Sequence, residues 1–317
     1  MSMHIPQTSM RPVRSVMAVP GHRYKMVQSA AASAADGVFI DLEDAVPPNE
    51  KAEALAGAIK ALNELDWGRK VVTVRVNSSD GRVVADEIKA LKKGAERLDT
   101  ILIPKVESVE TLRQAEELLA SEEGGCKDLR LEALMETAGG LANVETIAAA
   151  RGRLVGLHFG VGDFSASIGA RNVEVGGTHV GYAVTRRDEV GNYLTVTQDL
   201  WGYPMMRILV AARANGLRAV DGPFGGFRDL VLTRSMALKA AAMGYDGKQV
   251  VHPAQIEVTQ AAFTPTPEEV SQAQAMVTAM EEAEAQGLAA VSVNGKMVDY
   301  ANVRMARRIL LMAGADA

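Results

Sequence analysis

Short runs of β-branched residues alternate with longer alanine-rich stretches along most of this chain, and this alternation limits the possible folds more than any other feature. The runs predict strands at residues 15–19, 38–42, 71–76, 100–103, 129–135, 154–160, 217–220 and 248–251. Helical patterns lie between them, for example at residues 25–35, 50–65, 82–93 and 109–119. Such alternation is typical of a parallel sheet. Eight strands at intervals of roughly 25–30 residues favour a closed (β/α)8 TIM barrel.

A doubly wound open sheet is the competing fold, and it would need a glycine-rich turn after the first strand. Pro20-Gly21-His22 stands there instead, and Gly160-Val161-Gly162 is only a fragment of a dinucleotide-binding fingerprint. The barrel is therefore the favoured fold. A long interval separates the sixth and seventh predicted strands. Its residues 169–192 are rich in Gly, Arg and Asp and predict a long loop over the active face.

The barrel pattern predicts a catalytic domain at residues 1–263, followed by a small α+β appendage at residues 264–317. In the appendage, a proline followed by two glutamates predicts the start of a helix. Asn294-Gly295 between short apolar runs predicts a hairpin. An amphipathic pattern at residues 301–312 predicts a final helix.

The composition excludes several classes of protein. Hydrophobic residues make up 48% of the chain, and 34 basic against 39 acidic residues give a net charge of −5, which is ordinary for a globular protein. Because there is no basic run, we expect no nucleic-acid partner. The single cysteine, Cys126, excludes an intrachain disulfide and a thiolate metal cluster. No apolar stretch approaches the roughly 18 residues of a membrane span, so we expect a soluble cytoplasmic protein.

In a TIM barrel the reacting groups lie at the C-terminal ends of the strands. Carboxylates are abundant at these predicted ends, where they include Asp41, Glu43, Asp44, Glu136, Asp163 and Asp221. A divalent cation would relieve their mutual repulsion, and oxygen ligands suit Mg²⁺ or Mn²⁺. Glu136 and Asp163, which follow neighbouring strands, are the best pair of metal ligands. Each could instead be a solvated loop carboxylate or a helix N-cap.

Arg75 ends a strand of alternating pattern, so it could point into the barrel mouth and bind a carboxylate or an oxyanion. The alternative is a structural ion pair with Asp41 or Glu43. Lys105 could form a Schiff base, but the nearby acids would raise its pKa and oppose that chemistry. We interpret His252 as a structural hydrogen-bonding histidine rather than a base.

A series of short motifs follows the predicted strands: Val19-Pro20-Gly21-His22-Arg23, Ile40-Asp41-Leu42-Glu43-Asp44-Ala45-Val46, Val74-Arg75-Val76-Asn77, Ile103-Pro104-Lys105-Val106-Glu107-Ser108, Met135-Glu136-Thr137 and Gly160-Val161-Gly162-Asp163-Phe164. In this order and spacing they resemble the citrate lyase β-subunit branch of the HpcH/HpaI aldolase family. Within that branch the chain is most similar to malyl-CoA and β-methylmalyl-CoA lyases. That similarity rests on Asp221-Gly222-Pro223-Phe224-Gly225, Gly247-Lys248, His252-Pro253 and Asn294-Gly295-Lys296-Met297-Val298-Asp299.

The resemblance implies a Mg²⁺-dependent carbon–carbon lyase that acts on coenzyme A thioesters. By this resemblance, Glu136 and Asp163 match the metal ligands. Glu43 and Asp44 match acids that hold metal-bound waters, and Arg75 matches the arginine at the reacting carbonyl.

Asp299 matches the tail acid proposed to move the proton at the acetyl methyl, although it could also be the N-cap of the last helix or a solvated loop acid. The family's barrels form trimers or hexamers, with the tail as a lid on a neighbouring subunit's site. Arg14, Arg23 and Lys25 are the basic residues that we expect to contact coenzyme A. Ser29 is a departure, because malyl-CoA lyases carry a lysine at the matching place.

We therefore expect a lyase that reversibly cleaves L-malyl-CoA, β-methylmalyl-CoA or citramalyl-CoA through a thioester enolate. The products would be acetyl-CoA or propionyl-CoA and a 2-oxoacid such as glyoxylate. Three alternatives stay open: a malyl-CoA thioesterase, a 2-oxoacid aldolase that does not use coenzyme A, and a subunit of a larger lyase complex that is inactive alone.

Overall fold

The computed structural model describes residues 11–79, 82–121, 125–126, 128–150, 152–171 and 173–314. The chain divides into two compact units, Met1–Thr259 and Gln260–Ala317. Among the described helices, none is long and apolar enough to cross a membrane.

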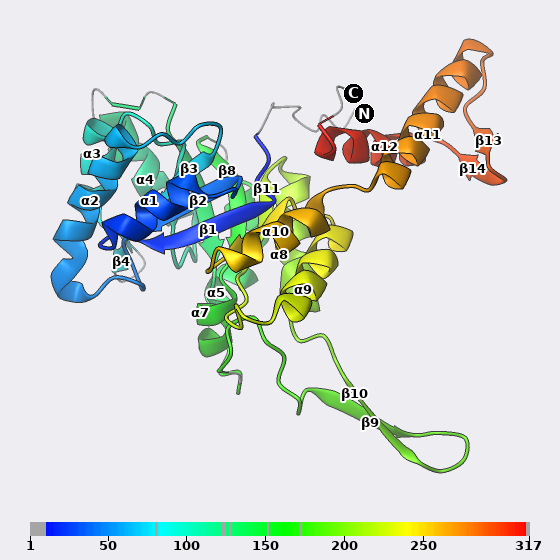
Figure 1. Cartoon of the computed structure of the whole chain (residues 1–317), viewed down its shortest axis with the longest axis horizontal. Coiled ribbons are helices and arrows are strands. Elements are labelled where there is room, and N and C mark those ends of the chain that lie inside the picture. The colour runs from blue at the N-terminus through cyan, green and yellow to red at the C-terminus, as the bar shows by residue number, and fades with distance from the viewer. Residues whose placement is uncertain are drawn as a thin grey trace. The chain divides into compact units, whose positions relative to one another are not determined.

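Eight parallel strands of the first unit close into a barrel (Figure 1). Neighbouring strands around the barrel follow the order β1-β12-β11-β8-β7-β6-β3-β2. Their bounds are β1 Ser15–Pro20, β2 Gly37–Asp41, β3 Val71–Arg75, β6 Thr100–Ile103, β7 Arg130–Met135, β8 Leu154–Phe159, β11 Arg218–Asp221 and β12 Gly247–Val250. The predicted TIM barrel is thus confirmed, and each predicted strand overlaps an observed one.

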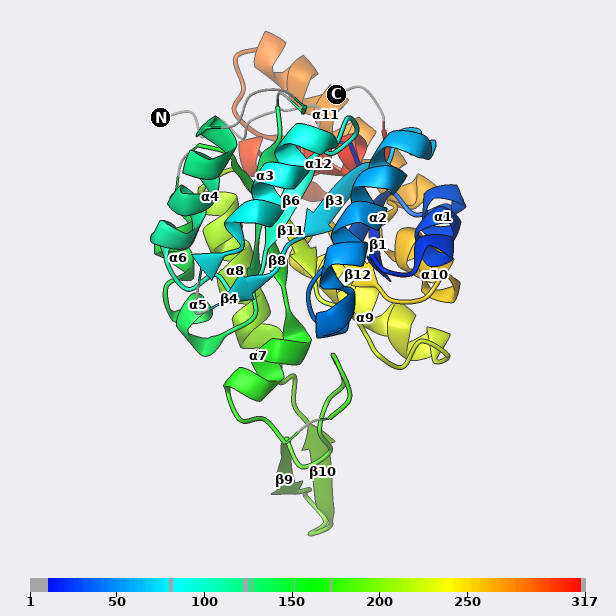
Figure 2. The same cartoon turned by 90° about the vertical axis from the view of Figure 1, so that its left-hand side faces the viewer.

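Helices cover the outside of the barrel (Figure 2). Their bounds are α1 Tyr24–Ala32, α2 Lys51–Glu64, α3 Ala85–Gly94, α4 Val109–Ser121, α5 Ala138–Ala142, α6 Val144–Ala148, α7 Val161–Ser167, α8 Gly202–Ala214, α9 Leu230–Met243 and α10 Ala254–Phe263, with a 3₁₀ turn at Pro48–Glu50. Helix α2 shows the sequence basis of this layer. It buries Ala54, Ala58, Ala61 and Leu62, whose spacing places them on one face.

Four of the eight barrel strands, β2, β6, β11 and β12, are buried along their whole length. Every residue of β2 and of β6 is buried, because the barrel interior covers one face of a strand and the helices cover the other. Polar side chains with access to a substrate therefore belong to the strand ends and the loops that follow them.

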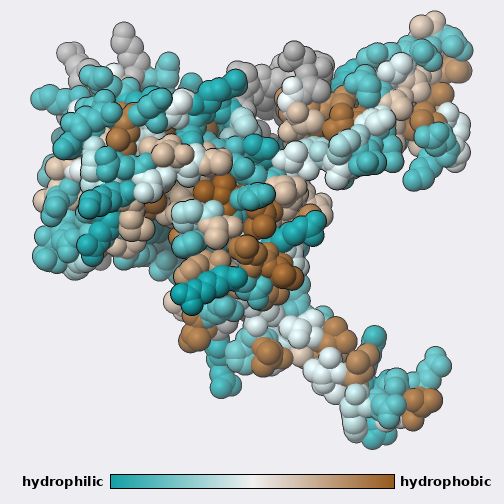
Figure 3. Space-filling view, viewed as in Figure 1, coloured by the Kyte–Doolittle hydropathy of each residue, from teal (hydrophilic) through white to brown (hydrophobic). Residues whose placement is uncertain are grey.

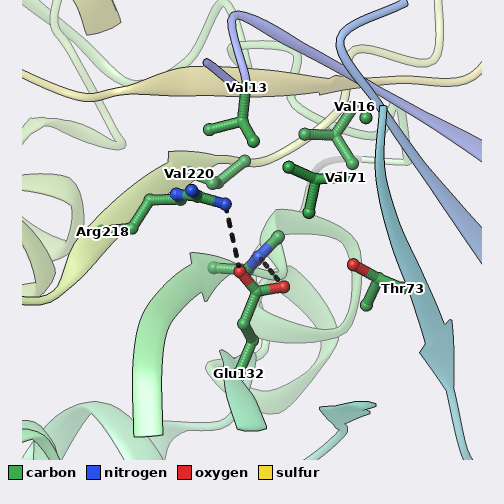
Figure 4. A pocket seen from close by; sticks show the side chains of 9 residues that line it. Val13, Val16, Val71, Thr73, Glu132, Arg218 and Val220 are labelled. Atoms are coloured by element: carbon green, nitrogen blue, oxygen red, sulfur yellow. Dashed lines mark ion pairs between the residues drawn. The ribbon is translucent and has the colours of Figure 1, made fainter. Parts of the chain in front are cut away.

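A polar cluster lies inside the barrel, around Glu132 of β7 (Figure 4). Its carboxylate lies 3.2 Å from Nε2 of His158 and 3.7 Å from Nη1 of Arg218, and it accepts a hydrogen bond from Thr100. Burial alone would raise the pKa of Glu132, but His158 and Arg218 lower it to about 2. The sequence analysis missed this cluster, which places paired charges inside the barrel beside the apolar side chains of Val13, Val16, Val71 and Val220.

The segment between β8 and β11 differs from the predicted loop. Strands β9 (Ala183–Arg187) and β10 (Tyr193–Thr197) pair antiparallel in a hairpin that projects from the barrel (Figures 1 and 2). The prediction of a long loop over residues 169–192 was therefore wrong for residues 183–187, which form β9. The β-branched pair Val184-Thr185 and the run Thr195-Val196-Thr197 of β10 were the available strand signal. Apolar side chains on this hairpin are open to solvent (Figure 3). A shorter pair joins β4 (Ser78–Ser79) and β5 (Arg82–Val83).

The second unit consists of α11 (Pro267–Ala285), the hairpin of β13 (Val291–Val293) and β14 (Lys296–Val298), and α12 (Tyr300–Met312). Its own small core includes Ala273, Val277, Met280, Val298, Val303 and Leu310. The hairpin turn has positive φ at Asn294 (50°) and Gly295 (77°), as the Asn-Gly pair predicts. The predicted elements of the α+β appendage are all present.

Candidate active site

Charged side chains gather where neighbouring strands of the barrel end. Five adjacent strands, β2, β3, β6, β7 and β8, present in turn Asp41, Glu43 and Asp44; Arg75; Lys105; Glu136; and Asp163. Asp163 lies in the first turn of α7, directly after β8. Because parallel strands bring their carboxyl ends to the same rim, these residues share one face of the barrel.

Arg75 is held in a two-point ion pair by Asp41. Its Nε and Nη2 donate to the two carboxylate oxygens of Asp41 at 2.6 and 2.7 Å, which confirms the structural ion pair considered from sequence. The remaining Nη1 lies 3.3 Å from Oε2 of Glu43, so the guanidinium also faces the acids at the strand ends. Burial alone would raise the pKa of Asp41, but Arg75 lowers it.

Asp41 also shapes the loop that carries the neighbouring acids. It accepts the backbone N–H groups of Glu43 and Ala45, each at 2.9 Å. Lys51 supports the same loop, because its ammonium donates to the carbonyls of Leu42 and Glu43. The sequence analysis missed both supporting roles. Asp41 is an acid at the end of an otherwise apolar strand, and this position was the signal in the sequence that could have identified it.

Lys105 touches the acids with both its backbone and its side chain. Its Nζ lies 2.6 Å from Oε1 of Glu43 and 3.3 Å from Oδ2 of Asp44, and its backbone N–H donates to Oε1 of Glu136 at 2.8 Å. Burial alone would lower the pKa of Lys105, but the bond to Glu43 and the charge of Glu136 raise it. A lysine held protonated is a poor nucleophile, which argues against the Schiff-base alternative.

Glu136 is the most perturbed acid of the site. It is only 1% exposed, and burial raises its pKa to about 8, with a further upward contribution from Asp163 and Glu43 that Arg75 and Lys105 do not cancel. Gly160 makes room for it, because a Cβ at that position would lie 2.6 Å from Oε2 of Glu136. The structure thus maintains a buried carboxylate whose charge is incompletely balanced.

This donor set fits a divalent cation that prefers oxygen. Glu136 and the partly buried Asp163 come from adjacent strands, and a cation between them would offset their repulsion. Within the described ranges, no group of three or more His, Cys, Asp or Glu residues is arranged to hold a metal. A site with two protein carboxylates and open positions suits Mg²⁺ or Mn²⁺, which keep several waters.

The basic residues expected at coenzyme A separate into two places. Arg23 and Lys25 are exposed at the start of α1, directly after the C-terminal end of β1. Arg14 instead precedes β1, at the opposite end of the barrel, where its Nε lies 2.7 Å from Oδ2 of Asp36. The expectation for Arg14 is therefore corrected, because a residue before a strand cannot reach the rim at the strand's far end.

Asp299 belongs to the second unit and caps α12. Its Oδ1 accepts the backbone N–H groups of Ala301 and Asn302, and Oδ1 of Asn302 accepts the backbone N–H of Asp299. The N-cap alternative is thereby confirmed as a structural role. A cap bonds through one oxygen, so it does not by itself exclude a second role for this carboxylate.

The structure also agrees with the interpretation of His252. The His252 ring stacks on Phe227, with the ring centroids 4.6 Å apart, and its Nδ1 accepts the backbone N–H of Ala254. Both contacts are structural.

Comparison with known proteins places this site in a family. The sequence profile of the HpcH/HpaI aldolase/citrate lyase family matches residues 14–253. The chain belongs to this family. An L-malyl-CoA/β-methylmalyl-CoA lyase of Cereibacter sphaeroides is 36% identical over 312 residues, which are 97% of this chain and 96% of the relative. A (3S)-malyl-CoA thioesterase of the same species is 35% identical over 306 residues, 96% of each chain.

A solved structure of similar fold agrees with the family assignment. It is protein CitE of Mycobacterium tuberculosis in complex with magnesium, acetoacetate and coenzyme A, which is 29% identical to this chain with a TM-score of 0.73. The match covers 96% of the chain described here and 100% of the CitE chain. Similarity at this level spans both units of the chain.

Proposed function

We propose that this protein is a Mg²⁺-dependent carbon–carbon lyase that acts on 3-hydroxyacyl-CoA thioesters. The substrates would be L-malyl-CoA, β-methylmalyl-CoA or citramalyl-CoA, and the products acetyl-CoA or propionyl-CoA with a 2-oxoacid such as glyoxylate. The single observation that carries the proposal is the gathering of the buried Glu136, Asp163 and the Arg75 guanidinium at the C-terminal ends of neighbouring barrel strands. The lyase named among the relatives supports the choice of substrate.

Glu136 and Asp163 would hold the Mg²⁺ ion, or Mn²⁺ in its place. When bound, such an ion supplies Lewis acidity and orients the hydroxyl and carboxylate oxygens of the substrate. Glu43 and Asp44, held by Lys105, would accept hydrogen bonds from waters beside the ion. Lys105 also fixes Glu136 through its backbone N–H, so the buried ligand has one orientation.

In the cleavage direction, the bond between the α and β carbons of the thioester breaks. Its electron pair moves onto the α carbon and the thioester oxygen as an enolate. The β hydroxyl would give its proton to the waters that Glu43 and Asp44 hold, and would thereby become the carbonyl of the 2-oxoacid. Arg75 would stabilise the enolate oxygen, because Asp41 fixes the plane of its guanidinium and Nη1 faces the acids of the site.

A proton must then reach the α carbon of the enolate. We assign this step to Asp299, and we infer that the tail delivers it to the site of a neighbouring subunit in a homotrimer or homohexamer. A general acid at this point would contribute roughly 10²–10⁴-fold to the rate. Arg23 and Lys25, exposed after β1, would contact the phosphates of coenzyme A.

A malyl-CoA thioesterase is the second candidate function, because one similar relative carries that name. A direct assay separates the two. Purified protein would be incubated with acetyl-CoA or propionyl-CoA and a panel of 2-oxoacids, and the condensed thioesters would be detected by mass. A lyase forms malyl-CoA from acetyl-CoA and glyoxylate. Hydrolysis of malyl-CoA to free coenzyme A without glyoxylate would instead identify a thioesterase.

A further inference from the structure

Lys105 has an unusual backbone for a lysine. Its φ is 50°, in the left-handed region that residues with a side chain rarely adopt. Among the described residues other than glycine, only Asn294 in the tight turn of the second unit shares this sign of φ. Strain of this kind persists where the surrounding structure imposes it, and it clusters at functional sites.

The left-handed conformation lets one residue contact three acids. The backbone N–H bonds Glu136 at 2.8 Å, while the ammonium lies 2.6 Å from Glu43 and 3.3 Å from Asp44. Strand β6, which Lys105 follows, lies between β3 and β7, so the residue links the acids after β2 to the acid after β7. Lys105 therefore joins the two sides of the acidic rim.

The charges at the strand ends show what the contacts of Lys105 contribute. Two of the three nitrogens of Arg75 are bound by Asp41, which leaves Nη1 toward the remaining acids. The ammonium of Lys105 is the other cation that pairs with the side-chain carboxylates of Glu43 and Asp44 within the described structure. Without it, the carboxylates of Glu43 and Asp44 would keep only Nη1 of Arg75 as an ion-pair partner among the described residues.

We propose that Lys105 is a positioning residue that acts as a resident counter-cation of the metal site. It holds the acids together before a metal binds, and its positive charge offsets part of their attraction for the divalent ion. This inference rests on the proposed function, because it takes Glu136 and Asp163 as the metal ligands. Removal of the ammonium should therefore make the folded protein depend more strongly on the metal.

The test compares melting temperatures in chelator and in Mg²⁺, together with Mn²⁺ affinity measured by electron paramagnetic resonance. Lys105→Met removes the charge, Lys105→Arg keeps it, and Lys105→Gly removes both the charge and the backbone strain. Lys239→Met is the matched control, because Lys239 pairs with Asp199 at 2.9 Å and its side chain is 35% exposed against 33% for Lys105.

We expect the Mg²⁺-dependent rise in melting temperature to be larger in Lys105→Met and Lys105→Gly than in the wild type, with Mn²⁺ bound about tenfold more tightly. Lys105→Arg and Lys239→Met should show the wild-type rise. A rise in Lys105→Met equal to or smaller than that of the wild type would overturn the inference. So would wild-type behaviour of Lys105→Gly, because the effect would then come from backbone strain. Absence of any Mg²⁺ response in the wild type would overturn the metal site itself.

Discussion

Arg75 illustrates how neighbouring residues aim a single side chain. Asp41 binds it at two points, and the same carboxylate accepts two backbone N–H groups of the following loop. The guanidinium and the loop acids therefore share one anchor. This arrangement predicts that the planar shape of the Arg75 side chain is as important for catalysis as its positive charge.

Arg75→Lys tests that statement. Lysine keeps the positive charge but loses the fork that Asp41 holds, so the enolate oxygen would lose an oriented donor. We expect kcat to fall by about 10²–10³-fold, with a much smaller change in KM for the CoA thioester. Steady-state kinetics of the purified variant measures both. A change confined to KM would reassign Arg75 to ground-state binding.

The buried position of Glu136 predicts that the stability of the metal-free protein depends on pH. Burial raises its pKa from 4.5 to about 8, so between these values the folded protein keeps a proton that the unfolded chain has released. The free energy of unfolding should then fall as the pH rises through this window. Glu136→Gln keeps the shape of the side chain but cannot ionise.

Urea unfolding in chelator at several pH values measures this effect. The wild type should lose more stability than Glu136→Gln between pH 4.5 and about 8, and added Mg²⁺ should reduce the loss in the wild type. Identical pH profiles of the two metal-free proteins would contradict the assigned environment of Glu136.

At the scale of elements, local patterns predicted most of the barrel. Buried β-branched runs marked its strands, and the Asn294-Gly295 turn marked the hairpin of the tail. The β9–β10 hairpin was missed because its exposed strands lack the apolar runs of a core strand. The Arg75–Asp41 ion pair was among the alternatives considered from sequence. The bond from the Lys105 backbone to Glu136 and the bonds of Asp41 to the loop backbone could not be predicted, because they depend on backbone conformation and on the order of strands in the barrel.

Substitutions of Asp299 separate its role as the N-cap of α12 from its proposed role in proton transfer. Asparagine can still cap α12 through its side-chain oxygen, whereas alanine cannot. Asp299→Asn should therefore fold with wild-type stability but lose kcat by orders of magnitude. Asp299→Ala should in addition lose about 0.5–2 kcal/mol of stability. Thermal melts and kinetics of both variants check this, and a fully active Asp299→Asn would leave the residue with capping alone.

At the scale of the whole molecule, the likeness to the C. sphaeroides lyase covers 97% of the chain and so includes the tail. The proposed role of the tail in a neighbouring subunit predicts complementation between inactive variants. Mixed oligomers of Asp299→Asn and Glu136→Ala should regain part of the wild-type activity, because some sites then combine an intact metal ligand with an intact acid. Once subunit exchange has been confirmed by mass, inactive mixtures would show that the acid does not act between subunits.

The central claim is that Glu136 and Asp163 hold a metal on which carbon–carbon bond chemistry depends. Its most direct test is the formation of malyl-CoA from acetyl-CoA and glyoxylate by chelator-treated protein, followed by the addition of Mg²⁺. Wild-type protein should be inactive in chelator and recover with Mg²⁺, whereas Glu136→Ala should stay inactive under both conditions while remaining folded. Full activity of Glu136→Ala, or wild-type turnover that chelator leaves unchanged, would contradict the account.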